Sequence, residues 1–159
     1  MARRGVDLVV VGGIGGILHG SPITTKDVDV VPDLKATNLD ALADALDEMN
    51  ARVVAHDAPD GLIEIDWRGK DLRRWIVDFR FLILMTDYGR VDLIHRPAGT
   101  SGYSDLARNA IDVKLDEVHV RVAALEDIIR SKEAAGRERD LAQLPTLRRL
   151  LEAKQQRRA

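Results

Sequence analysis

Hydrophobic residues fall into short, separated runs along the 159-residue chain, and the spacing within each run indicates a strand or a helix. Apolar runs and alternating positions predict strands over residues 6–11, 28–31, 53–55, 62–66, 76–85, 91–94 and 118–122. Helical spacing predicts helices over 14–18, from Thr37 or Asn38 to Met49, over 104–110, and after residue 123, where Gly136 and Pro145 are expected to interrupt them. Because strands and helices mix without strict alternation, we expect an α+β fold (α/β mixed) in which helices flank a mixed sheet.

Length and composition fit one ordinary globular domain. Hydrophobic residues make up 45% of the chain and charged residues 31%. We therefore expect a single domain over residues 1–159, with a mixed-sheet core over 1–122 and C-terminal helices over 123–159. No apolar run approaches the roughly 20 residues that cross a bilayer, so no membrane partner is expected. Cysteine is absent, which excludes disulfides and thiolate-bound metals and favours the cytoplasm.

The formal net charge of −2 conceals an uneven distribution. Residues 121–159 hold ten Lys and Arg against six Asp and Glu, whereas residues 1–120 hold fourteen against twenty. The acidic part suits cation binding, and the basic segment 121–159 suits phosphate or an RNA backbone. The alternative is that these charges are only the solvated faces of helices.

A glycine-rich stretch follows the first predicted strand. Gly12-Gly13 and Gly15-Gly16 precede a short helical spacing, and a helix N-terminus after glycines can bind an anion. The stretch lacks the Gly-Lys-Ser/Thr of a P-loop, and Leu18 stands where the dinucleotide fingerprint needs its last glycine. A tight turn with close helix packing therefore competes with phosphate binding.

The pair Asp27 and Asp29 is the sharper signal. Residues i and i+2 of a strand point to the same side, so the two carboxylates lie close together and repel. A compensating cation relieves that repulsion, and oxygen ligands without cysteine favour Mg²⁺ or Mn²⁺. The alternative is a solvent-exposed edge strand that carries two acids.

The order of these motifs resembles the DNA polymerase β-like nucleotidyltransferase superfamily. In that superfamily a Gly-Gly or Gly-Ser pair precedes Asp-x-Asp, and a later strand adds a third carboxylate, which Asp92 in Gly89-Arg90-Val91-Asp92-Leu93-Ile94 matches. Residues 120–147, with Lys132-Glu133-Ala134-Ala135-Gly136-Arg137 and Asp140, are similar to the closing helices of the minimal and AbiEii-like branch. The resemblance implies the polymerase β-like nucleotidyltransferase fold over nearly the whole chain.

The resemblance also implies a two-metal nucleotidyl transfer, in which an NMP moves from an NTP to a hydroxyl with loss of pyrophosphate. Asp27, Asp29 and Asp92 would be the catalytic carboxylates and metal ligands for Mg²⁺ or Mn²⁺. The residues expected to bind nucleotide are Gly12, Gly13, Ser21, Thr25, Lys26, Lys132 and Asp140. Lys26 is included because Ile23 stands where relatives often have an arginine. For Lys132 the alternative is a purely helix-stabilising role.

Partners follow from the same resemblance. Many members of the branch belong to toxin–antitoxin pairs, so a cognate partner is expected, and tRNA, other RNA or protein is favoured over a small molecule as acceptor. Relatives usually have a helix before the first strand, and only Ala2 to Gly5 precede it here, so either the reading frame starts late or another copy of the chain completes the sheet, which makes a homodimer one expectation. The alternative function is a catalytically silent binding or regulatory module, which Ile23 favours and the three carboxylates oppose.

Overall fold

The computed structural model describes residues 1–58, 61–65 and 72–157. The strands are β1 (Leu8–Val10), β2 (Asp27–Pro32), β3 (Arg52–Ala58), β4 (Gly61–Ile65), β5 (Phe81–Thr86), β6 (Gly89–Ile94), β7 (Ile111–Leu115) and β8 (Val118–Val122). The helices are η1 (Ala2–Arg4), α1 (Gly12–Leu18), α2 (Ala36–Glu48), α3 (Leu72–Asp78), α4 (Tyr103–Asn109), α5 (Leu125–Ala135) and α6 (Glu138–Gln156).

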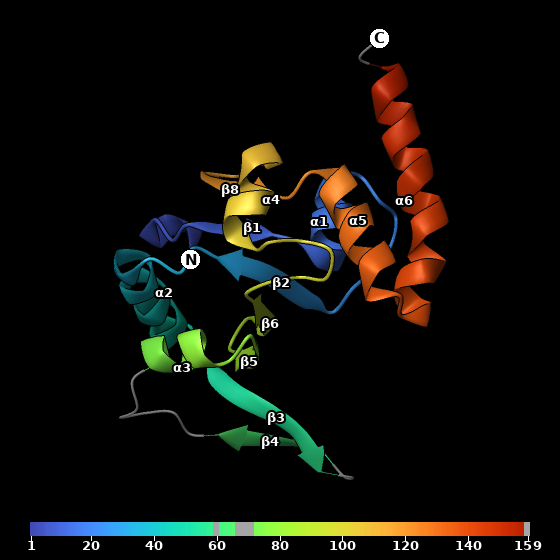
Figure 1. Cartoon of the computed structure of the whole chain (residues 1–159). Helices are drawn as coiled ribbons and strands as arrows, with labels where there is room; N and C mark the ends of the chain where they lie inside the picture. The colour runs from blue at the N-terminus through green and yellow to red at the C-terminus, as the bar shows by residue number, and fades with distance from the viewer. Residues whose placement is uncertain (59–60, 66–71, 158–159) are drawn as a thin grey trace.

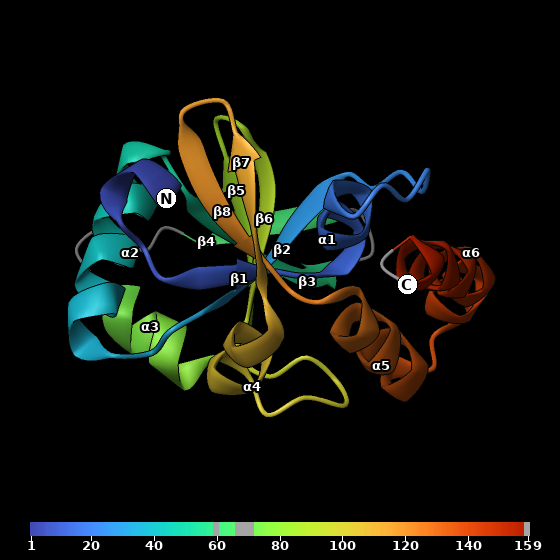
Figure 2. The ribbon, with the colours of Figure 1, turned by 90° about the horizontal axis from the view of Figure 1, so that it is seen from above.

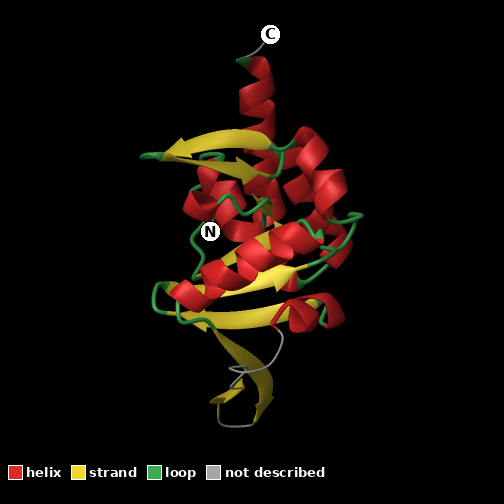
Figure 3. Cartoon of the chain, turned by 90° about the vertical axis from the view of Figure 1, so that its left-hand side faces the viewer, coloured by secondary structure: helices red, strands yellow, loops and turns green. Residues whose placement is uncertain are grey.

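One mixed sheet joins all the described strands in the order β4-β3-β5-β6-β2-β1-β8-β7. The pairs β2–β6 and β1–β8 are parallel, and the other neighbouring pairs are antiparallel. The chain therefore has the α+β architecture that its sequence predicts. The β3–β4 hairpin and the end of α6 project from opposite ends of the molecule (Figures 1 and 3).

Helices cover both faces of this sheet, and alternation along β1 shows how. Val10 packs in a cluster with residues of α2 and α3, whereas its neighbour Val9 packs in a second cluster with residues of α4, α5 and α6. Figure 2 shows α2 and α3 on one side of the molecule and α5 and α6 on the other. Side chains that share the orientation of Val9 thus point toward α4, α5 and α6, and this is the side on which the candidate site lies.

Several predicted elements differ from the structure. The run 76–85 was predicted as one strand, but its first part lies in α3 and only Phe81–Thr86 is a strand. The spacing of Trp75 and Phe79 brings their rings to 5.2 Å, and Ile76 is fully buried in the cluster that includes α2. Tertiary packing of a helical face therefore outweighs the strand propensity of these residues.

The ends of helices were also predicted incorrectly in two places. Helix α2 begins after Lys35 without a side-chain cap, and Asn38 lies inside the helix, where its amide donates to the carbonyl oxygens of Asp7 and Asp33. Pro145 does not end a helix, since α6 continues through it. Leu144 and Leu147 on either side of Pro145 are buried in the second cluster, and their packing maintains the helix there.

Other boundaries agree more closely or lie beyond what is described. Strand β8 and the first helix after it match the prediction, whereas β7 was not predicted. Asp66, the last residue of the predicted strand 62–66, lies outside the described residues. The expectation of one domain over residues 1–159, with a mixed-sheet core over 1–122 and C-terminal helices over 123–159, stays a prediction. No helix in the described ranges is both long and apolar enough to cross a membrane.

Candidate functional site

Two parallel strands bring the three predicted carboxylates together. In the β2–β6 pairing Asp29 lies opposite Asp92, and Asp27 lies opposite Arg90. Each of Asp27, Asp29 and Asp92 offers a carboxylate oxygen, and these oxygens lie within 4.8 Å of one another. Val28 and Val30, which alternate with the two aspartates, pack on the opposite side with the α2 and α3 cluster. Because successive side chains of a strand point to opposite faces, β2 has one face in the hydrophobic core and one acidic face.

The charges of this acidic cluster are only partly balanced. Arg90 donates from Nε and Nη2 to the two oxygens of Asp92, both at 2.7 Å, and the Asp92 side chain is only 4% exposed. The Thr25 hydroxyl donates to Asp27. Asp29 has no such direct cation among the described residues, and burial together with the neighbouring Asp27 and Asp92 raises its pKa to about 6. Lys132 and Arg90 oppose that shift without cancelling it.

Glycine is required where α1 begins beside these carboxylates. Gly12 has a φ of 61°, and a Cβ at this position would overlap the Asp29 carboxylate. A Cβ on Gly13 would lie 2.7 Å from Cβ of Thr25. Gly15 instead approaches α5, since its Cβ would lie 2.9 Å from Cδ1 of Ile128. The first glycine pair therefore opens the site, whereas Gly15 serves the close packing of α1 on α5.

Helices α5 and α6 supply a second charged group, centred on Asp140. Lys132 Nζ donates to Asp140 Oδ1 at 3.0 Å, and Arg137 donates to the other oxygen. The Lys132 and Asp140 side chains are only 12% and 4% exposed. Burial acts to raise the pKa of Asp140, but the bonds from Lys132 and Arg137 outweigh it and lower that pKa. Asp140 thus fixes the position of Lys132. The sequence predicted Asp140 only as a nucleotide-binding residue and not in this role.

These two groups face one cavity of about 340 Å³. Its sheet side includes the three carboxylates with Arg90, and its α1 side includes Gly12, Gly13 and Thr25. Lys132, Arg137, Arg139 and Asp140 line its helical side. The structure therefore brings eight of the ten predicted site residues to a single cavity: Gly12, Gly13, Thr25, Asp27, Asp29, Asp92, Lys132 and Asp140.

Two predicted nucleotide-binding residues lie elsewhere. Ser21 is buried in the turn after α1, and its hydroxyl oxygen accepts the backbone N–H of Ile23. Lys26 is exposed just before β2, and neither residue lines the cavity. His19 is buried and hydrogen-bonds the carbonyl oxygen of Ala123 through Nε2, which is the environment of a packing residue. Nucleotide contacts by Ser21 and Lys26 stay predictions.

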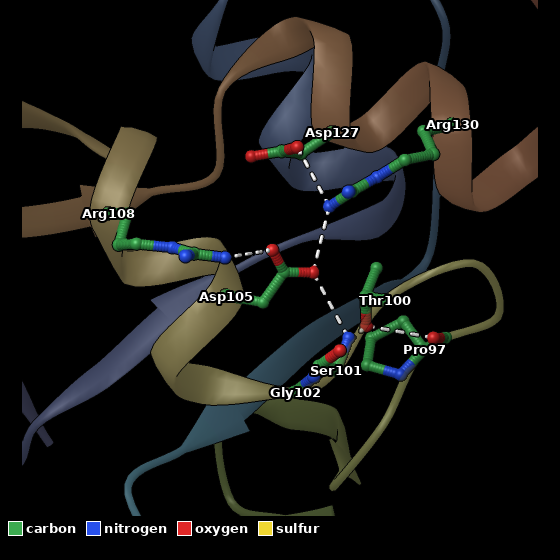
Figure 4. A network of polar contacts seen from close by, with 8 residues as sticks. All are labelled: Pro97, Thr100, Ser101, Gly102, Asp105, Arg108, Asp127 and Arg130. Atoms are coloured by element: carbon green, nitrogen blue, oxygen red, sulfur yellow. Dashed lines mark hydrogen bonds and ion pairs between the residues drawn. The ribbon is translucent and has the colours of Figure 1, made fainter.

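A polar network holds the wall formed by the loop at 97–102, α4 and α5 (Figure 4). Asp105 accepts the backbone N–H of Ser101 at 3.0 Å and pairs with both Arg108 and Arg130 at 2.9 Å. Arg130 also pairs with Asp127, which lines the cavity. The network fastens the loop to both helices, so this part of the cavity has a fixed shape.

Sequence analysis missed two of the charged residues that shape the site. Arg90 stands two positions before Asp92 on the same strand, and this same-face spacing was an available signal for their pairing. Arg137 stands three positions before Asp140 in the chain, a spacing that brings side chains together on a helix. Both pairings are local, two and three positions apart in the chain, so neither depends on the register between β2 and β6.

Comparisons with known proteins agree with this architecture. No protein-family model matches the chain, and no curated protein matches it either. Among solved structures it is similar to a Thermotoga maritima protein that is provisionally assigned as a nucleotidyltransferase, with a TM-score of 0.52 and 19% sequence identity. The similarity covers 93% of this chain and 83% of that one. At this identity the likeness shows the fold, and the chain has the nucleotidyltransferase-like fold that its sequence predicts.

Proposed function

We propose that this protein is a metal-dependent nucleotidyltransferase, which moves an NMP from an NTP to a hydroxyl acceptor. The observation that carries the proposal is the convergence of Asp27, Asp29 and Asp92 on one cavity that Lys132 also lines. Paired carboxylates on neighbouring strands, beside a glycine turn and a fixed lysine, suit a substrate that combines phosphates with divalent metal. The fold of the chain is consistent with this chemistry.

The donor set fits a hard divalent cation. All three candidate ligands are carboxylates, and hard ions such as Mg²⁺ and Mn²⁺ prefer oxygen. The raised pKa of Asp29 reflects its burial first and the neighbouring charges of Asp27 and Asp92 second, which Lys132 and Arg90 do not cancel. A cation bound by these oxygens would offset that repulsion and favour the ionised form of Asp29. Asp27, Asp29 and Asp92 would hold it.

The proposed reaction forms a bond between the acceptor oxygen and the α-phosphorus, and it breaks the bond from that phosphorus to pyrophosphate. Bound divalent metal would neutralise charge on the phosphates and favour the ionised acceptor hydroxyl. Lys132, held by Asp140, would place a positive charge beside the leaving phosphates. The backbone at Gly12 and Gly13 would let those phosphates approach closely. Asp92, oriented by Arg90, would accept the proton of the acceptor hydroxyl.

A second candidate is the catalytically silent binding or regulatory module. It is favoured by the pairing of both Asp92 oxygens with Arg90, because a metal ligand has to share or exchange that partner. A further part of our proposal, drawn from the resemblance of the sequence alone, is that the protein acts in the cytoplasm as one component of a toxin–antitoxin pair. An RNA or protein acceptor is favoured there over a small molecule.

Incubation with each α-labelled NTP, with Mg²⁺ or Mn²⁺ and either total tRNA or cell extract, tests the main proposal. We expect label to enter an acceptor with the wild-type protein and not with the D27N/D29N variant. The D112N variant is the matched control, because Asp112 is an exposed aspartate of β7 that does not line the cavity. Absence of label under all conditions, together with no stabilisation of the wild type by metal and NTP, would favour the silent module.

A further inference from the structure

Two cations of the cavity have no acidic partner among the residues that the structure describes. Arg90 pairs with Asp92, while Lys132 and Arg137 pair with Asp140. Arg96 and Arg139 also line the cavity, are exposed, and form no ion pair within the described part of the chain. A cation that the protein leaves unpaired at a cavity is available to an anionic ligand.

An exposed aromatic ring lies at the same side of the cavity as Arg96. Phe81 pairs with Ile94 across β5 and β6, and Arg96 follows Ile94 by two residues. Phe81 is 48% exposed and lines the cavity. Phe79 stacks on Trp75, whereas Phe81 has no ring partner among the described residues. Phe81 therefore presents a free aromatic surface beside an unpaired arginine.

Phe81 and Arg96 lie on or directly after the strand pair β5–β6, which carries Asp92, the third carboxylate. Phe81, Asp92 and Ile94 belong to the paired ends of β5 and β6, and Arg139 approaches the cavity from the first turn of α6. We name Phe81, Arg96 and Arg139 the mouth residues. The mouth residues thus line one cavity together with the carboxylates and the group around Lys132.

The backbone beside Arg96 is held in place. Pro97 and Ala98 line the cavity, and the loop that follows them is fastened to α4 and α5 by Asp105 and Arg130 (Figure 4). A Cβ on Gly99 would lie 2.8 Å from Cβ of Ala134, so this loop lies directly on α5. A fixed backbone reduces the entropy lost when a ligand orders the arginine.

We propose that the mouth residues bind the terminal nucleotides of a single-stranded nucleic acid, which is the acceptor of the reaction. Phe81 stacks on a nucleobase while Arg96 and Arg139 contact backbone phosphates, and the terminal hydroxyl then reaches Asp92. Stacking on an aromatic ring combined with unpaired cations is the usual means of binding single strands without base preference. The inference rests on the proposed function, and it names the acceptor class of the same site.

This assignment differs from binding by the basic segment 121–159 as a whole. Arg148 in that segment pairs with Glu133 at 2.6 Å and does not line the cavity. Arg149 and Arg157 are exposed on α6 and just after it, and they do not line the cavity either. They therefore provide a matched control, since their substitution removes the same charge from the same protein at sites away from the carboxylates.

The test is binding of a fluorescein-labelled 12-nucleotide single-stranded RNA, measured by anisotropy at two salt concentrations. We expect the R96Q/R139Q variant to bind at least about 10-fold more weakly and to show a salt slope smaller by about 1 to 2. We expect F81A to bind about 5- to 100-fold more weakly, the range for loss of one stacked base. The R149Q/R157Q control should change affinity less than about 3-fold. An equal loss in the control, or no RNA binding by the wild type, overturns the proposal.

Thermal melting with Mg²⁺ and NTP separates this inference from the proposed function. The F81A variant should keep the wild-type stabilisation by metal and NTP, because Phe81 belongs neither to the carboxylate cluster nor to the helical side of the cavity. If that stabilisation is present and the mouth variants bind RNA as the wild type does, only the inference fails, and label on protein would identify a protein acceptor. If metal and NTP stabilise no variant, the proposed function itself fails. R96Q/R139Q decides the outcome should F81A not fold.

Discussion

The sheet side and the helical side of the cavity treat buried carboxylates in opposite ways. Asp140 on α6 is paired by both Lys132 and Arg137, and its pKa is lowered. Asp29 on β2 lies beside two further carboxylates, and its pKa is raised to about 6. The difference shows that the fold can neutralise a buried acid where it needs one for structure. Asp29 instead keeps a raised pKa through its burial and two neighbouring acids, which supports our proposal that it binds a cation from outside the chain.

Removal of the acidic cluster should have the largest effect. In D27N/D29N we expect nucleotidyl transfer to fall by at least about 100-fold, because two of the three proposed metal ligands lose their charge. Stability without metal should stay equal or rise, since like charges no longer repel. Initial rates with labelled NTP and thermal melting in EDTA measure the two effects. A variant that unfolds in EDTA at temperatures where the wild type is folded would show that the cluster stabilises the fold instead.

Removal of the Asp140 charge from the helical side should lower the stability of the protein, in contrast to removal of the acidic cluster. In D140N the buried Lys132 loses its ionised partner, and we expect a loss of about 3 kcal/mol in the free energy of unfolding, the scale for breaking a buried pair. NTP affinity should fall as well, because Lys132 is no longer held. Urea denaturation and NTP titration measure both quantities. The D112N variant is the control, and a stable D140N protein would remove the contrast between the two sides.

The raised pKa of Asp29 predicts a dependence of stability on pH. Its pKa in the folded protein is about 6, above the ordinary 3.8, so the folded state holds the proton more tightly. Stability from this group is thus present below about pH 4 and lost as pH rises through about 6, with a magnitude of about 2 kcal/mol. Unfolding free energies of the metal-free wild type and D29N at pH 4.5 and 7.5 measure it. Equal pH responses of the two proteins would contradict the prediction.

Lys26 should give the smallest effect. It is exposed and does not line the cavity, so K26A should change NTP affinity by less than about 0.5 kcal/mol. K132A should lose about 1–3 kcal/mol of NTP binding, the scale for a hydrogen bond to a charged group. Titration of both variants with the same NTP compares them directly. A larger loss in K26A would restore the contact that the sequence predicted and place the phosphates nearer to β2.

Much of this architecture could be predicted from local pattern. The apolar run before Gly12, the alternation of acids and valines at Asp27 to Val30, and the final strand before Leu125 all recur in the structure. These elements are predictable because burial of one face imposes its period on the sequence. The proximity of Asp92 to Asp29 came from family resemblance, since no local pattern reports which strands become neighbours.

Other features depend on tertiary contacts that no window of sequence contains. The strand-like run around Ile76 becomes a helix because α2 offers a surface for it. Lys132 and Asp140 were predicted as separate nucleotide contacts, but the packing of α5 on α6 makes them partners of each other. Phe81 and Arg96 carried no signal in the sequence, because only the β5–β6 register and the loop after it bring them to one cavity.

The parallel pairing of β2 with β6 has a consequence for how the protein acquires activity. Asp29 and Asp92 are far apart in the chain, and α2, β3, β4, α3 and β5 lie between them. Closing so long a loop costs chain entropy, and proteins rich in such contacts fold slowly. A nascent or partly folded chain would contain the Asp27–Asp29 pair without its third member. On the proposed function, metal-dependent activity would therefore require the pairing of β2 with β6, which completes the set of three carboxylates.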